Sequence, residues 1–435
     1  MPINNTFKRL MLVVALILFG VSISMIYKHL EMPTGSPAPD IDNLPPARLA
    51  KLGKRIPPQV VGRPTPIQLK PLKTVKGAVT DEQLFAALSS ALPLWHPPTV
   101  PGLFHELMLW GPSTRFDASL VGHTWSGQRA KDILLSNELC RVCTVQLGGE
   151  YLIDSPYGIH VVKLGSVDSE ASRGEAHHGQ LLKILAEAGV PITSPVTTAS
   201  GRVGTVQELL QDTTLRFSLD RENEFMATAL ALWLPPTNHW NDEHGTSHTF
   251  DELLHKLIAR RHGEGSCGGC HIPYAVVVLL RVDQEHHLLS AESRTHACEW
   301  LSELTRLLTR TRRDVGGWDG SWAGVVNGKD VGIHGGNEVL ARITITGHHL
   351  EWIALAPPEL RPSDDIIADA VAALVNDLDQ LPDWGRQSFK VLLPCSHAAR
   401  AICLLKGVEP SAAWQSLFTS GRAFRTRKGY RLSDP

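Results

Sequence analysis

Apolar residues recur every three or four positions along most of the chain from residue 80 onward, the pattern of amphipathic helices. The first stretch begins at Thr80 with a capping hydroxyl and carries Leu84, Phe85 and Leu88 on one face. Similar stretches span 180–188, 222–234, 250–258, 271–282, 291–308, 347–355, 364–378 and 396–405. Only residues 140–164, with Val142, Thr144 and Gln146 followed by 159–164, have the composition of strands. We therefore expect a mainly α body with one small β excursion.

The N-terminal region has a different pattern. An apolar run from Leu10 to Tyr27 follows Lys8 and Arg9, and its 18 residues at ~1.5 Å each would cover ~27 Å. We expect a transmembrane anchor within residues 1–30, with the N-terminus cytoplasmic and the body periplasmic or otherwise extracytoplasmic. A cleaved signal peptide ending near Ser22-Ile23-Ser24 is the alternative, but the run is long for one.

Residues 31–79 are rich in proline, which prevents helix formation and favours extended polyproline II structure. They predict a semi-rigid stalk between the anchor and the body. The remaining residues, 80–435, then form one large helical domain.

Composition narrows the classes of function. Lys plus Arg total 42 and Asp plus Glu total 44, so the net charge of -2 gives no basic excess for binding nucleic acid. A hydrophobic fraction of 43% argues against intrinsic disorder. Seven scattered cysteines are too few for a disulfide scaffold.

Histidines and cysteines recur at the predicted helix starts, directly before apolar residues. The positions are His177, His178, Cys270, His271, His348, His349, Cys395 and His397. If the helices stack in a ring, these side chains converge on one face of a central cavity. A capping role at each helix start is the simpler alternative.

These segments resemble the α/α-toroid superfamily, which includes terpenoid cyclases and protein prenyltransferases. The matching stretches are RGEAHHGQLLKILAEAGVPI at 173–192, ENEFMATALALWLPP at 222–236, GSCGGCHIPYAVVVLLRVD at 265–283, DGSW at 319–322 and TGHHLEWIALAPPEL at 346–360. The nearest resemblance is to membrane-anchored proteins typical of planctomycetes, in which the third stretch usually reads CGGTH. The resemblance implies paired helices wound into a toroid-like barrel with a central cavity.

The chain also departs from the toroid enzymes. It has no DxDD acid motif, and the acidic run beginning at Asp364 has the wrong spacing for DDxxD and follows Pro362 and Ser363. That run is better interpreted as the acidic N-terminus of a helix.

Cys267-Gly-Gly-Cys270-His271 has the CxxCH spacing of c-type haem attachment. Every methionine lies upstream of the motif, so a downstream Met cannot be the axial ligand and a second histidine would be required. A disulfide between the two cysteines is another interpretation, although a two-residue spacer strains the ring.

A zinc site is the second interpretation of these residues. The ligand types that Zn²⁺ prefers are supplied by either Cys270 or Cys267, by His271, by His348 or His349, and by Cys395 or His397. Among toroids, prenyltransferases and lanthionine cyclases hold zinc with such residues near the cavity mouth. A purely structural role for the same side chains stays open.

Three functions follow from these alternatives, and one of them is a c-type haem protein that binds haem through Cys267, Cys270 and His271. The other two follow from the cavity. The first is a membrane-anchored binding module whose cavity, bordered by His177, His178, His349 and Cys395, holds a small-molecule or protein ligand. The second is a toroid-type enzyme in which His271, His348, Glu351 and His397 act around the cavity, with His348 and Glu351 three apart on one helical face.

Overall fold

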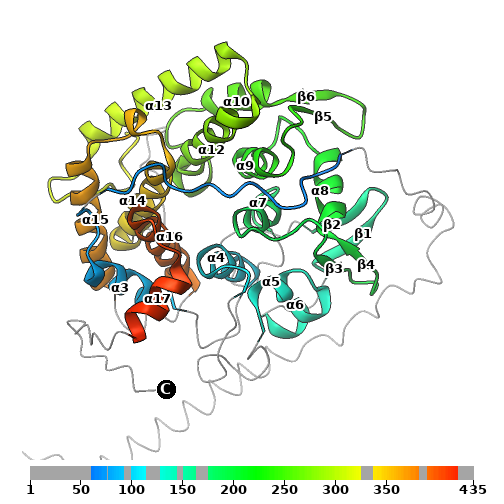
Figure 1. Cartoon of the computed structure of the whole chain (residues 1–435), viewed down its shortest axis with the longest axis horizontal. Coiled ribbons are helices and arrows are strands. Elements are labelled where there is room, and N and C mark those ends of the chain that lie inside the picture. The colour runs from blue at the N-terminus through cyan, green and yellow to red at the C-terminus, as the bar shows by residue number, and fades with distance from the viewer. Residues whose placement is uncertain are drawn as a thin grey trace, which may run out of the picture. The chain divides into compact units, whose positions relative to one another are not determined.

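Helices occupy most of the chain that the structure describes, confirming the mainly helical prediction (Figure 1). This computed structural model describes residues 60–75, 77–92, 99–113, 128–144, 150–162, 175–324, 337–381 and 389–419. The helices are α3 (Asp81–Ser90), α4 (Val100–Trp110), α5 (Ala130–Leu134), α6 (Asn137–Cys143), α7 (Gln180–Glu187), α8 (Val206–Leu215), α9 (Glu224–Trp233), α10 (Phe250–Ile258), α11 (Ser266–Gly269), α12 (His271–His286), α13 (Ala291–Thr311), α14 (Glu338–Leu355), α15 (Asp364–Asp379), α16 (Phe389–Lys406) and α17 (Pro410–Thr419), with a 3-10 turn at Pro358–Leu360.

The strands form three short antiparallel hairpins within the described residues. β1 (Leu152–Ser155) pairs with β2 (Gly158–Val161), β3 (Pro195–Thr197) with β4 (Val203–Thr205), and β5 (His239–Asn241) with β6 (Ser247–Thr249). The first lies inside the predicted β region, but the other two were not expected. The strand predicted around Val142 is wrong, because this residue lies in α6, where the Ser136 side chain caps the helix start.

Local sequence signals place several helix starts correctly. Thr80 and Thr249 each form a full capping box, with Gln83 and Glu252 returning a side-chain acceptor to the cap backbone N–H. The two reciprocal hydrogen bonds satisfy backbone N–H groups that a helix start otherwise leaves unpaired. α10 consequently has the predicted bounds.

We expect Thr249→Ala to lower the free energy of unfolding by about 1 kcal/mol, since it removes the acceptor for the Glu252 N–H. Urea denaturation of the purified protein measures this change. Thr309→Ala, at an exposed position in the last turn of α13, is the matched control and should change stability by less than about 0.5 kcal/mol. Equal effects of the two substitutions would contradict a capping role.

Two helices begin well before their predicted starts. α14 starts at Glu338 and α16 contains Pro394, so His348 and His397 lie inside helices and do not cap them. Gly347 marks a close helix contact: a Cβ there would lie 3.1 Å from the backbone N of Ala398. This close approach brings the faces of α14 and α16 together beside both histidines.

The helices that carry these histidines belong to a set of six, which we call the inner helices. In order, α4, α7, α9, α12, α14 and α16 each contact the next, and α16 contacts α4, so the contacts form a closed cycle (Figure 1). α3, α10, α13 and α15 pack against members of this set. All residues of α4 and α9 are buried, as expected for helices enclosed on all sides.

Five of the inner helices run in the same direction. At one end, side chains near or before the middle of the helices meet, as in the contact between the rings of His271 and Phe225. At the other end, the lining of one small cavity includes residues from α7, α9, α12, α14 and α16, namely Glu187, Leu232, Tyr274, Val278, Leu355, Arg400 and Leu404. We call these the histidine end and the C-terminal end.

Residues 60–75, within the predicted stalk, pack across the C-terminal end (Figure 1). The backbone N–H of Ile67 donates to the Leu232 carbonyl over 3.0 Å, and the Gln68 side chain donates to the Ala186 carbonyl over 2.7 Å. These donors bond to carbonyls in the last turns of α9 and α7, where helix carbonyls lack the usual N–H partner four residues on. This part of the proline-rich region therefore contacts the helical body.

The predicted transmembrane run Leu10–Tyr27 lies outside the described residues. Among the described helices, no single one has the length and apolar composition of a membrane span. α16 and α17 reach those values only when taken together, across a bend of 84°.

Candidate functional site

Four histidine rings meet at the histidine end of the inner helices. Ring centroids are 4.8 Å apart for His271 and His348, 3.7 Å for His348 and His397, and 5.9 Å for His271 and His397. The ring of His105, from α4, lies 5.0 Å from that of His397. The structure thus brings together the three predicted site histidines and adds a fourth.

Backbone hydrogen bonds fix the orientation of two of these rings. Nδ1 of His348 lies 2.7 Å from the Thr344 carbonyl, and Nδ1 of His105 lies 2.6 Å from the Pro101 carbonyl. A carbonyl only accepts, so each Nδ1 carries the hydrogen and each Nε2 presents a lone pair. Nε2 of His348 is buried without a hydrogen-bond partner.

Cys267 completes a group with the ligand types of a metal site. One ligand atom each from Cys267, His271 and His348 all lie within 4.8 Å of one another. Bonds of ~2.0–2.3 Å to one shared tetrahedral zinc ion place the ligand atoms ~3.3–3.8 Å apart, so a shift of about 1 Å would bring these atoms onto one ion. The described cluster therefore has the composition and proximity needed to hold a metal ion.

The cysteine in this group is Cys267, and Cys270, the alternative ligand, is not part of it. Cys267 has φ 49° and ψ 44°, a left-handed conformation that is uncommon for a residue other than glycine. Cys270 instead lies beneath His349, with its Sγ 3.8 Å from Nε2 of that ring. Both thiols are free, and Cys267 is partly exposed whereas Cys270 is buried.

Glu351 links the histidines to a buried ionic network. Its Oε2 accepts from Nδ1 of His397 over 2.9 Å, and its Oε1 accepts from the Arg400 guanidinium over 3.1 Å. Arg400 also donates to the Tyr274 hydroxyl over 2.8 Å and lies 3.4 Å from Glu187. Lys183 completes the network with a contact of 2.9 Å to Glu187.

Burial keeps the clustered imidazoles neutral. It lowers the pKa of His271, His348 and His397 well below the ordinary value, and each is lowered further by a neighbouring histidine. Neutral imidazole is the form that binds metals. Loss of water around the sulfur raises the pKa of the Cys267 thiol to about 12, and the Glu222 charge adds to this rise. Metal binding would oppose that rise, because it favours the thiolate.

A second polar group lies beside Cys267. Nδ1 of His177 is 2.8 Å from Glu222 and 2.9 Å from the Ser266 hydroxyl, which also donates to Glu222. The His177 ring stacks on Phe225 at 4.6 Å, and Phe225 contacts His271 at 4.6 Å. The side chains of His177 and Glu222 are partly exposed, so this group borders the site on the solvent side.

Three predicted cavity residues are not among the grouped metal-ligand atoms. His349 packs among Trp318, Trp322 and Trp352 and accepts from the indole N–H of Trp352 over 3.1 Å, which gives it a structural role. His178 and Cys395 are buried in the body. Helix geometry explains why His348 lies in the cluster and His349 packs among tryptophans, because adjacent helical residues point about 100° apart.

Glu175, whose carboxyl bonds to the start of α7, makes the free energy of unfolding depend on pH. Its carboxylate accepts from the backbone N–H groups of Gly179 and Leu181, and burial raises its pKa from 4.5 to about 7. Ionising this carboxyl therefore costs more in the folded chain than in the unfolded chain. The resulting contribution to the free energy of unfolding is full below pH 4.5 and is lost as the pH rises to about 7.

We expect Glu175→Gln to flatten the pH dependence of the unfolding free energy between pH 5 and pH 8. Urea denaturation of both proteins at the two pH values measures the change. Glu138→Gln, which alters a fully exposed carboxylate, should retain the wild-type dependence. A wild-type slope in Glu175→Gln would contradict this explanation.

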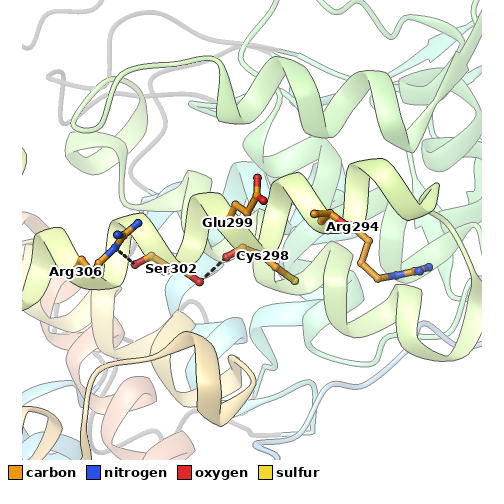
Figure 2. A pocket seen from close by; sticks show the side chains of 6 residues that line it. Arg294, Cys298, Glu299, Ser302 and Arg306 are labelled. Atoms are coloured by element: carbon orange, nitrogen blue, oxygen red, sulfur yellow. Dashed lines mark hydrogen bonds between the residues drawn. The ribbon is translucent and has the colours of Figure 1, made fainter.

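A hollow of about 430 Å³ lies on the outer surface of α13 (Figure 2). Its described lining, including Arg294, Cys298, Ser302 and Arg306, comes from this helix alone. Figure 2 shows these side chains along one helix face, with Ser302 bonded to a backbone carbonyl. This shallow surface is separate from the histidine end.

Sequence inspection missed several residues of the site. His105 is preceded by Phe104 and lies in an apolar stretch, with no motif to identify it. Lys183 and Arg400 did leave a signal, since each is a lone cation within an otherwise apolar helical segment. Such a charge is almost never buried without a partner, which could have predicted the network.

The comparisons with known proteins add no relative. No protein-family model, curated protein or solved structure matches this chain. The interpretation of the site therefore rests on its own residues and chemistry.

Proposed function

We propose that this protein is a metalloprotein in which Cys267, His271 and His348 hold a zinc ion at one end of an α/α toroid. The observation that carries the proposal is the proximity of three ligand atoms within 4.8 Å. The buried Nε2 of His348, which lacks a hydrogen-bond partner, supports it. The closed cycle of inner-helix contacts supports the toroid.

The donor set favours zinc over hard cations. Thiolate and imidazole are ligands that Zn²⁺ prefers, whereas Ca²⁺ and Mg²⁺ prefer oxygen. Three protein ligands leave a fourth position for water or a substrate, which is the arrangement of catalytic zinc sites. There the ion would act as a Lewis acid or lower the pKa of a bound water.

The two ends of the inner helices differ in accessibility. Residues 60–75 cover the C-terminal end, where the cavity has a volume of only about 30 Å³, enough for one water molecule. At the histidine end, Cys267 and the His177–Glu222 group are partly exposed. We propose that a small-molecule or peptide ligand reaches the metal beside these residues, and that Leu10–Tyr27 anchors the chain in a membrane with the body outside the cytoplasm.

Metal analysis of the full-length chain tests the proposal. Purified protein reconstituted with zinc, then freed of excess metal, should retain one zinc per chain by elemental analysis. Cys267→Ser, His271→Ala and His348→Ala should each weaken zinc binding about 100-fold or more. Cys270→Ser and Cys298→Ser are matched controls that remove a thiol outside the ligand set.

The same measurement separates the alternatives. Retention of copper in preference to zinc would keep the site but change its chemistry, since a cysteine with two histidines also suits copper. A wild-type chain that retains no metal would overturn the proposal. In that case a metal-free binding module would be the better interpretation.

A further inference from the structure

His397 lies beside the proposed metal site without belonging to its ligand set. Its ring centroid is 3.7 Å from that of His348, yet the group of mutually close ligand atoms comprises only Cys267, His271 and His348. The role of His397 must therefore come from what its second ring nitrogen can do.

Glu351 determines which nitrogen of His397 carries the hydrogen. The carboxylate lies 2.9 Å from Nδ1, so Nδ1 donates and Nε2 is left with a lone pair. The other oxygen of Glu351 is held by Arg400, which is held in turn by Tyr274. A carboxylate fixed on both oxygens keeps the imidazole in one tautomer and one orientation.

We propose that His397 accepts a hydrogen bond from a protic group, water or a hydroxyl, at the open coordination position of the metal, and that Glu351 positions it. This inference rests on the proposed zinc site. It defines the class of ligand, because a group without a hydrogen to donate would leave the lone pair of His397 unpaired. An unpaired buried acceptor is unfavourable because it loses the hydrogen bond that water would give it.

Histidine ¹⁵N NMR of the full-length chain tests the inference without knowledge of a substrate. Long-range ¹H–¹⁵N spectra distinguish a protonated nitrogen, a free lone pair, a hydrogen-bond acceptor and a metal-bound nitrogen. His348→Gln and His397→Gln assign the two signals. We expect zinc to move Nε2 of His348 into the metal-bound range and Nε2 of His397 only into the acceptor range.

Azide then probes the open position, because it replaces water on zinc and has no hydrogen to donate. Azide should return the His397 signal to the free lone-pair range while His348 stays metal-bound. His349 is the internal control and should not respond, since its Nδ1 is already bonded to Trp352.

Glu351→Gln tests the positioning role, with the exposed Glu338→Gln on the same helix as its control. The first variant should retain zinc but show a mixture of His397 tautomers, whereas the second should match wild type. If Glu351→Gln does not fold, the wild-type spectra with azide still decide the inference.

The outcomes separate the two proposals. A metal-bound or protonated Nε2 of His397, or zinc binding with no change at His397, overturns this inference and leaves the zinc site standing. No response of any histidine to zinc overturns the zinc site and this inference together.

Discussion

Arg400→Met is expected to lower the free energy of unfolding by about 3–5 kcal/mol, the cost typical of removing one partner of a buried ion pair. Arg400 contacts the carboxylates of Glu187 and Glu351, and both side chains are almost fully buried. Methionine fills a similar volume but leaves these charges without their guanidinium partner. Urea denaturation at pH 7 measures the loss.

The pKa of Glu187 gives the physical reason. Burial alone would raise it, but the positive charges of Arg400 and Lys183 lower it to about 2. Glu187 therefore stabilises the fold fully above its unfolded pKa of 4.5, and this contribution is lost as the pH falls toward 2. In Arg400→Met the folded-state pKa of Glu187 should rise, so the stability that Glu187 contributes above pH 4.5 should shrink or change sign.

Lys406→Met on the same helix is the control for Arg400→Met. Lys406 pairs with Asp81 at 2.8 Å, but both side chains are partly exposed, so its loss should cost less than about 1 kcal/mol. Adding Glu351→Gln to Arg400→Met should recover part of the stability, because it removes one uncompensated charge. Equal effects of Arg400→Met and Lys406→Met would show that the network contributes little.

Cys267→Gly is expected to raise stability while it removes metal binding. The left-handed backbone at Cys267 costs about 1–2 kcal/mol for a residue with a Cβ, and glycine relieves most of this cost. Without the thiolate, zinc affinity should fall about 100-fold or more. Denaturation of the metal-free proteins and competition with a zinc chelator measure the two effects.

Cys270→Gly is the matched control, since it makes the same substitution three residues later. Cys270 has φ -71° and ψ -17°, so glycine relieves no strain there and removes a fully buried side chain. We expect lower stability with zinc affinity retained. If Cys267→Gly lowers stability and leaves zinc affinity intact, the strained cysteine has a packing role and is not a ligand.

A gain in stability together with a loss of zinc affinity in Cys267→Gly would connect the strained backbone to metal binding. A costly backbone conformation persists where the surrounding structure imposes it, and such positions cluster at functional sites. Here the left-handed turn through Cys267 directs its sulfur toward His271 and His348. The proposed zinc site and the strained turn therefore make one joint prediction.

Local sequence signals predicted the helices whose first residues form side-chain caps. Thr249 and Glu252 define the start of α10 because a capping box involves only four consecutive residues. Gly347 and Pro394 misled the same reasoning, since both residues normally interrupt helices. In this fold Gly347 permits close packing of α14 on α16, a property of two helices far apart in sequence.

The sequence by itself determined a mainly helical body and singled out His271, His348, Glu351 and His397. Each histidine stands just before apolar residues and Glu351 follows His348 by three positions, so local patterns singled them out even though His348 and His397 do not lie at helix starts. Only the tertiary structure decided that Cys267 rather than Cys270 joins them, that His105 lies alongside, and that Arg400 holds Glu351. These choices depend on contacts between helices distant in sequence and on one left-handed residue, and no local pattern encodes either.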